Sequence, residues 1–145
     1  MAKPVYTAGA TVIGGRAAGR GQTTGGTLEV DLRLPAAMGG PGDGTNPEEL
    51  FAIGYAACFE SALGVVGRRE GTEVGDVSIE SKVSVLPRED HGFELAVALD
   101  VTLPQVQDAG LARRLVAATH EVCPYSNAVR GNVDVTLTAN GQPVD

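Results

Sequence analysis

The sequence predicts an α+β fold in which antiparallel sheets pack with one long, buried central helix, in a single domain of residues 1–145. Three observations support this prediction. Residues 46–67 begin with helix start signals and are apolar on every side. Several segments alternate apolar and polar residues, and short turns join them in pairs, which favours antiparallel pairing. Residues 108–122 place apolar side chains on one face of a second helix.

The central helix is predicted over residues 46–67, NPEELFAIGYAACFESALGVVG. Asn46 is a good N-cap, because its side chain can accept a hydrogen bond from the first turn, and Pro47 suits the first helical position. Glu49 can reach back as in a capping box. Since apolar residues cover every side, we expect the helix inside the protein or between subunits. The segment is too short and too rich in Gly, Glu and Ser for a convincing membrane span.

Strands are predicted wherever apolar and polar residues alternate, over residues 6–13, 28–34, 77–86, 93–103 and 133–138. The segment just before residue 28 is expected to be the other arm of a hairpin. Residues 35–45 are predicted to form a flexible loop. Pro124 disfavours helix at the residue before it, so the second helix should stop at Cys123.

The composition excludes several classes of protein. A chain of 145 residues with 43% hydrophobic residues is long enough for one domain with a core. The net charge of −7 argues against nucleic acid or an anionic membrane surface as a partner. The N-terminus lacks an apolar core of signal-peptide length, so a cytoplasmic location is expected. Two cysteines and two histidines without paired spacing argue against a structural zinc site, and no metal is expected.

A homodimer is also predicted. The central helix has more apolar surface than one sheet can cover, and a second copy of the chain could bury the rest.

Cys58 and Cys123 are candidates for chemistry, and three interpretations remain open. They could be two buried free thiols, since cysteine packs as a small hydrophobe. They could be a redox pair, in which one thiol is oxidised to a sulfenic acid and the other condenses with it. Alternatively, Cys123 could act with His120 in a Cys-His hydrolase, although no partner to orient the histidine can be identified in the sequence.

Cys58 would need a cation to be reactive. A thiol in an apolar helix interior has its pKa raised, and the helix dipole acts only near the helix ends. Arg16 is the candidate cation, because it follows Gly14 and Gly15 on a loop able to fold over the helix. Arg20 is the competing candidate. The alternative for Arg16 is that it is a solvated arginine of the loop without such a role. The glycine-rich stretches lack the lysine of a phosphate-binding loop.

Three stretches resemble the organic hydroperoxide resistance proteins of the osmotically inducible protein C superfamily. They are GGR at Gly14–Arg16, MGGPGDGTNPEELFAIGYAACF from Met38 to Phe59, and HEVCPYSNAVRGNVDV from His120 to Val135. The resemblance extends over nearly the whole chain, including the order of strands and helices. It implies a thiol-dependent peroxidase that reduces organic hydroperoxides, including those of fatty acids, to alcohols in the oxidative stress response.

The resemblance also implies roles for individual residues. Cys58 would be the peroxidatic thiol and Cys123 the resolving thiol, joined in a redox-active disulfide during turnover. Arg16 would activate the thiolate and steady the peroxide, and Glu48 would hold that arginine. No bound cofactor is implied, and the reductant would be dihydrolipoamide or a lipoylated protein. The family forms an intertwined homodimer with active sites at the subunit interface.

Apolar side chains could line a pocket for the alkyl tail of the peroxide, namely Met38, Phe51, Phe59 and Tyr125. Such a pocket would favour organic hydroperoxides over hydrogen peroxide, because only the former bury apolar area, worth about 25 cal/mol per Å². Plain core packing is the alternative for these residues. The alternative function is a non-catalytic dimer that binds an acyl chain or a lipid in the same groove, with both thiols incidental.

Two positions depart from the family pattern. Glu49 replaces the usual glutamine, and both suit a capping box. Glu60 stands where a small or neutral residue is usual, and a buried charge there would need a partner.

The spacing of Glu48 and Cys58 bears on which subunit provides each residue. They are ten positions apart (58 − 48), or about 15 Å along a continuous helix, and they lie on different faces. One arginine would hardly bridge both within a single subunit. We therefore predict that the Arg16–Glu48 pair meets Cys58 of the other chain.

Overall fold

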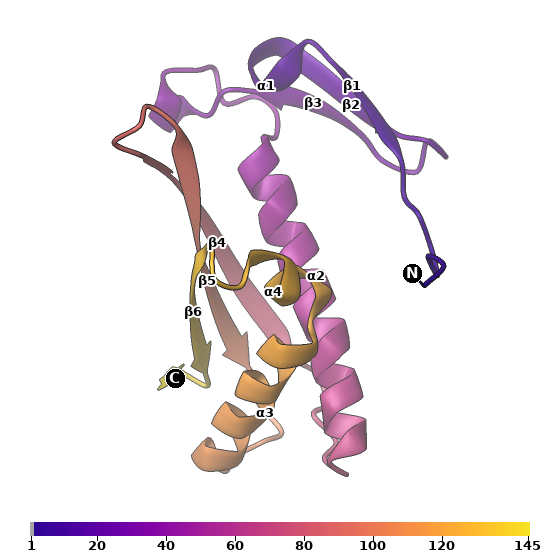
Figure 1. Cartoon of the computed structure of the whole chain (residues 1–145), viewed down its shortest axis with the longest axis vertical. Helices are drawn as coiled ribbons and strands as arrows, with labels where there is room; N and C mark the ends of the chain where they lie inside the picture. Colours follow the sequence, from indigo (N-terminus) through magenta and orange to yellow (C-terminus); the bar gives the residue numbers. More distant parts are fainter. Residues whose placement is uncertain (1) are drawn as a thin grey trace. The chain divides into compact units, whose positions relative to one another are not determined.

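The computed structural model of the chain describes residues 2–145 (Figure 1). Their contacts divide them into two compact units, a first unit that ends at Leu50 and a second unit that spans Phe51–Asp145. The predicted α+β class, with antiparallel strand pairs and a long central helix, is confirmed. The assignment of the whole chain to one domain stays a prediction.

The first unit contains a three-stranded antiparallel sheet in the order β1-β2-β3. Its strands are β1 (Ala10–Ile13), β2 (Gly19–Thr23) and β3 (Glu29–Arg33), with a one-turn helix α1 (Gly15–Ala18) and a 3₁₀ turn η1 (Ala36–Met38). The strands agree with the predicted segments, except that β1 begins at Ala10 rather than at residue 6. Helix α1 was not predicted, because four residues are too few to show a helical period.

The central helix α2 (Pro47–Arg69) begins as its sequence predicts. The Asn46 side-chain oxygen accepts a hydrogen bond from the Glu49 backbone N–H at 2.9 Å, so Asn46 is the N-cap. The Glu49 carboxylate does not complete a capping box, because it accepts instead from the Thr45 hydroxyl at 2.9 Å. The helix extends two residues beyond the predicted end at residue 67, to Arg69.

The second unit contains a four-stranded sheet in the order β4-β5-β6-β7. Its strands are β4 (Ser78–Pro87), β5 (Phe93–Thr102), β6 (Asp134–Ala139) and β7 (Gln142–Val144). Strands β4 and β5 form the predicted antiparallel hairpin, but β5 and β6 are parallel. The parallel pair follows from helix α3 (Ala109–Val122), which crosses between β5 and β6, since parallel neighbours need a long crossover.

The core of the second unit lies between one face of the sheet and helices α2 and α3 (Figure 1). Tyr55, Phe59 and Leu63 of α2 are fully buried there, as are Leu99 of β5 and Leu115 of α3. Because apolar side chains of three elements meet in one cluster, the face of α2 that points into it is fixed.

The opposite face of α2 is open in the single chain. Ile53 is 68% exposed, and Glu60 is exposed beside it. A groove of about 380 Å³ follows this face between α2 and β4, lined among others by Ile53, Ala56, Ala57, Glu60 and Ile79. The central helix is therefore buried on one side only within one chain, and Glu60 needs no buried partner there.

Helix α2 is the one helix within residues 2–145 that is long and apolar enough to cross a membrane by length and composition. The core helix of a soluble protein passes the same test, so this is weak support for a membrane span.

Candidate active site

The structure brings together the two cysteines of the chain. Cys58 lies on α2, and Cys123 lies between α3 and a short helix α4 (Pro124–Val129). Both side chains belong to the same apolar cluster, Cys123 is near enough to affect the pKa of Cys58, and both thiols are free. Cys58 is partly exposed, whereas Cys123 is fully buried. Two residues 65 positions apart (123 − 58) thus form one thiol pair.

Cys123 is held at the corner between two helices. Its backbone N–H donates to the Thr119 carbonyl at 2.9 Å, and its own carbonyl accepts from the Asn127 N–H at 2.9 Å. The predicted end of the helix at Cys123 is confirmed. Helix α4 was missed, because Pro124 was interpreted only as a terminator; proline also suits the first position of a new helix.

The surroundings of Cys58 in the second unit disfavour its thiolate. Burial raises the pKa of the Cys58 thiol above its ordinary value, and the neighbouring Cys123 raises it further. A hydrogen bond from the Tyr125 backbone acts in the opposite direction, but burial is the larger effect. The direction agrees with the sequence prediction. Because the thiolate is the nucleophile, Cys58 needs a positive charge that the residues setting this pKa do not provide.

Arg16 and Glu48 form an ion pair in the first unit. The Arg16 guanidinium donates to the Glu48 carboxylate at 2.5 Å, from α1 to the first turn of α2. The Arg16 side chain is 36% exposed and that of Glu48 18% exposed. Met38 lies beside this pair, with its sulfur 3.9 Å from Nη1 of Arg16. Arg20, the competing candidate, instead pairs with two carboxylates of the sheet, those of Glu29 and Asp31.

Strand β3 positions both partners of this ion pair. On one edge, Arg33 pairs with Ala18 at the end of α1, and its guanidinium donates to the Gly19 carbonyl at 2.9 Å. On the other edge, Leu32 pairs with Thr45, two residues before α2 begins. A side chain at Gly19 would collide with the α1 backbone, so the turn requires glycine. The pair is therefore built by the fold of the first unit.

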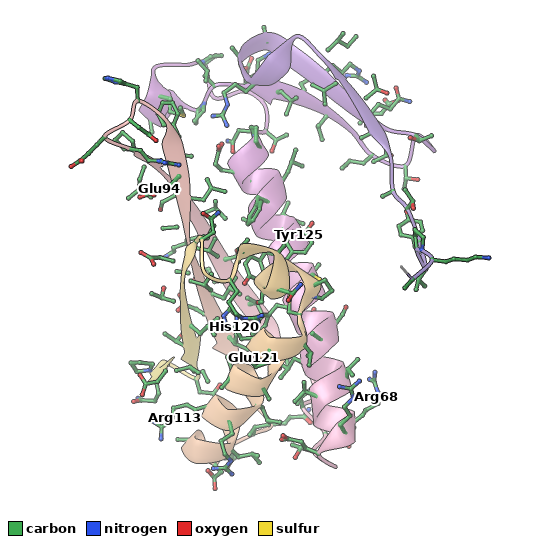
Figure 2. The ribbon with its side chains drawn as sticks, viewed as in Figure 1. Arg68, Glu94, Arg113, His120, Glu121 and Tyr125 are labelled. Atoms are coloured by element: carbon green, nitrogen blue, oxygen red, sulfur yellow. The ribbon has the colours of Figure 1, made fainter. Side chains whose placement is uncertain are left out.

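Aromatic rings gather around the thiol pair. The ring of Tyr125 lies 5.8 Å from that of Phe51 and 5.6 Å from that of Tyr55, centroid to centroid. Tyr125 lies on α4 at the surface of the unit (Figure 2) and is partly exposed, as is Phe51. Phe59 is fully buried in the core, which is the packing role that the sequence left open for these residues.

The histidine of the hydrolase interpretation has a different partner. Nδ1 of His120 lies 2.8 Å from the Ser126 hydroxyl, and within residues 2–145 no hydrogen bond joins His120 to either thiol. The structure therefore gives the hydrolase no support. In the same described part of the chain, no group of three or more His, Cys, Asp or Glu residues is gathered as a metal site would need.

Comparison with known proteins identifies relatives over most of the chain. The family model of OsmC-like proteins matches residues 40–138. The organic hydroperoxide resistance protein of Xanthomonas axonopodis pv. citri is 47% identical over 140 residues, which cover 94% of this chain and 95% of the relative. Organic hydroperoxide resistance protein OhrB of Bacillus subtilis is 46% identical, over 92% of this chain and 96% of the relative.

Solved structures give the same result. A putative organic hydroperoxide resistance protein of Vibrio cholerae, with captopril bound in one of its active sites, superposes with a TM-score of 0.92. It is 41% identical, over 98% of this chain and 96% of that chain. The OhrB structure from Bacillus subtilis superposes with a TM-score of 0.84 at 47% identity, over 92% of this chain and 98% of that chain.

Replacing Gly54 tests how closely α4 packs on α2. A Cβ atom at Gly54 would lie 2.7 Å from the Tyr125 hydroxyl and 3.2 Å from its ring. We expect Gly54→Ala to lower the free energy of unfolding by about 1–3 kcal/mol, because overpacking outweighs the gain in helix propensity. Gly64→Ala is the matched control, because its Cβ would meet only the end of Arg68, and we expect it to be neutral or stabilising. Urea unfolding of both variants measures this, and equal stability would contradict the packing described.

Proposed function

The chain belongs to the OsmC-like protein family, and from that premise we propose that it is a peroxidase that reduces organic hydroperoxides to alcohols through Cys58 and Cys123. The observation that supports this proposal best is that Cys58 and Cys123 are neighbours in the apolar cluster of the second unit. Two relatives that are 46–47% identical to this chain are named organic hydroperoxide resistance proteins, and these names favour organic hydroperoxides as substrates.

The first step is attack by the Cys58 thiolate on the terminal oxygen of the hydroperoxide. The O–O bond breaks, the alkoxide takes a proton and leaves as the alcohol, and Cys58 becomes a sulfenic acid. Cys58 is suited to this role because it is the partly exposed member of the pair. Cys123 is fully buried, so a substrate reaches Cys58 more easily.

The second step is attack by the Cys123 sulfur on the oxidised Cys58. A sulfur–sulfur bond forms, and water leaves with the hydroxyl of the sulfenic acid. A dithiol such as dihydrolipoamide, free or on a lipoylated protein, then reopens the disulfide by thiol–disulfide exchange. The proximity of the two side chains in one cluster of the second unit supports this step.

Activation of Cys58 is assigned to Arg16. A guanidinium next to the sulfur would favour the thiolate and lower the pKa that burial raises. Arg16 is one-third exposed while Glu48 holds one of its nitrogens, so it retains donors for a second anion. This leaves the guanidinium oriented and still able to bind a thiolate or a peroxide oxygen.

A homodimer would complete the site. The open face of α2, with Ile53 exposed along the groove beside β4, is a surface that a second copy of the chain could cover. In this arrangement the Arg16–Glu48 pair of one subunit would meet Cys58 of the other. Phe51, Tyr125 and Met38 would line the site as the apolar contact for an alkyl tail.

Replacing the peroxidatic thiol tests the activity directly. We expect the wild-type protein to consume cumene hydroperoxide with dihydrolipoamide as reductant, measured as peroxide loss over time. Cys58→Ser should reduce consumption to the rate without protein, because a serine hydroxyl is not ionised near neutral pH. Wild-type and Cys58→Ser proteins with equal rates would instead favour the non-catalytic dimer that binds an acyl chain or a lipid.

Replacing the activating arginine should change the pH dependence of Cys58 alkylation. In a Cys123→Ser background, we expect Arg16→Gln to raise the apparent pKa of Cys58, because the cation that favours the thiolate is lost. A rise of one pKa unit lowers the iodoacetamide alkylation rate near pH 7 by about tenfold. Arg20→Gln is the matched control, because Arg20 pairs with carboxylates of the sheet. The assignment is wrong if the Arg16→Gln profile coincides with that of the control.

A further inference from the structure

A chain of hydrogen bonds joins three helices around the thiol pair. The Tyr55 hydroxyl of α2 lies 2.7 Å from the Ser126 hydroxyl of α4, which lies 2.8 Å from Nδ1 of His120 on α3. Tyr55 and Ser126 are fully buried. Figure 2 shows His120 near the end of α3. The role proposed for the two cysteines uses none of these three residues.

The ionisation states in this chain of hydrogen bonds are set by burial. Burial raises the pKa of Tyr55 and lowers that of His120, so the phenol is protonated and the imidazole neutral near pH 7. Either hydroxyl can be the donor between Tyr55 and Ser126, and the role of Nδ1 depends on the tautomer of the His120 ring. In both directions the Ser126 hydroxyl accepts one hydrogen bond and donates the other, so it links the two residues.

The three residues flank the two cysteines at helical spacing. Tyr55 lies three positions before Cys58 on α2, on the same side of the helix. His120 lies three positions before Cys123, and Ser126 three positions after it. Tyr55, Cys58 and Cys123 all belong to the same apolar cluster. The Ser126 hydroxyl therefore ties the helix that contains Cys58 to both helices that meet at Cys123.

We propose that Ser126 is a positioning residue for disulfide closure, because it links Tyr55 to His120 and so holds the Cys123 corner against α2. This inference rests on the proposed peroxidase function. In closure, the Cys123 thiol reacts with the Cys58 sulfenic acid, the S–O bond breaks as the S–S bond forms, and the thiol proton leaves with the hydroxyl as water. The attacking sulfur must lie in line with the S–O bond, so the corner has to stay in place after Cys58 is oxidised.

The backbone contacts of Cys123 would not provide this restraint alone. They join Cys123 to Thr119 of α3 and to Asn127 of α4, the two helices on either side of it. Neither contact reaches α2. The Tyr55–Ser126 bond does, and it fixes α4 to the helix of Cys58. Loss of the Ser126 hydroxyl would leave the contacts of Tyr125 with Phe51 and Tyr55 to hold α4 on α2, without the buried hydrogen bond beside Cys123. The corner could then shift slightly, and small displacements of reacting groups slow such steps by tenfold to about a hundredfold.

The test separates oxidation of Cys58 from closure of the disulfide. Protein is mixed with one equivalent of cumene hydroperoxide without reductant and quenched with dimedone at set times. Mass spectrometry then measures the dimedone adduct of the sulfenic acid and the disulfide. For Ser126→Ala we expect oxidation at the wild-type rate and closure slowed by about tenfold or more, so the adduct accumulates. With excess peroxide, the slower closure should also increase sulfinic acid at Cys58.

Two further variants make the result specific. Tyr55→Phe removes the link to α2 but leaves the Ser126–His120 bond, and it should slow closure in the same way. The double variant Tyr55→Phe/Ser126→Ala should close the disulfide about as slowly as Ser126→Ala alone, because both substitutions remove the Tyr55–Ser126 hydrogen bond. Thr119→Val is the matched control: it removes another buried hydroxyl of this region, one that donates only to the Leu115 carbonyl of its own helix. This control should close at the wild-type rate.

Closure at the wild-type rate in Ser126→Ala and in Tyr55→Phe would overturn the inference, as would slow closure in Thr119→Val. Should Ser126→Ala fail to fold, Tyr55→Phe decides the question alone. A general loss of stability would lower oxidation and closure together, whereas the inference requires closure alone to slow. A wild-type protein that forms neither sulfenic acid nor disulfide would instead overturn the proposed function, and the inference with it.

Discussion

The proximity of Cys58 and Cys123 depends on three helices packing against each other. The Cys58 side chain has a fixed direction, because Tyr55 and Phe59, which lie before and after it on α2, are buried in the core. Cys123 has a fixed position because α3 ends and α4 begins at that residue. Packing of the core thereby holds the two reactive side chains close together. The proposed chemistry requires little else of the second unit.

Cys58 and the Arg16–Glu48 ion pair lie in different units and have different charge environments. Burial next to a second thiol works against the charge that Cys58 needs. The first unit builds an arginine–carboxylate pair whose guanidinium is still partly exposed, and strand β3 fixes both partners. The open face of α2 gives a physical reason for a dimer, which is how we propose that the site is completed.

The sequence predicted the features that depend on local pattern. Asn46 and Pro47 marked the start of α2, and the alternation in residues 93–103 marked β5. The pattern did not predict α1 or β7, because a helix of four residues and a strand of three are too short to show a period. Helix α4 was missed because Pro124 was interpreted only as the end of a helix. The parallel pairing of β5 and β6 was not predicted, because the sequence analysis considered only strands joined by short turns, which pair antiparallel. Helix α3 joins β5 to β6 and allows them to be parallel.

The site could be predicted only in part. The residues alone left three interpretations of the cysteines open: two free thiols, a redox pair, or a Cys-His hydrolase with His120. The family resemblance implied the redox pair, and the structure places Cys58 and Cys123 in one cluster. The same resemblance implied the Arg16–Glu48 pair, which the structure contains. The Tyr55–Ser126–His120 chain could not be predicted, because it joins three helices whose packing no local pattern encodes. Whether Arg16 acts on its own subunit or on the partner stays a prediction.

The central claim is that one equivalent of peroxide takes two electrons from the two thiols and leaves a bond between these two sulfurs. The most direct measurement is a thiol titration with intact mass spectrometry after one equivalent of cumene hydroperoxide is added to reduced protein. The account predicts that two thiols disappear together and that each chain loses about 2 Da, the mass of two hydrogen atoms. Loss of one thiol with a gain of about 16 Da, or no loss at all, would contradict it.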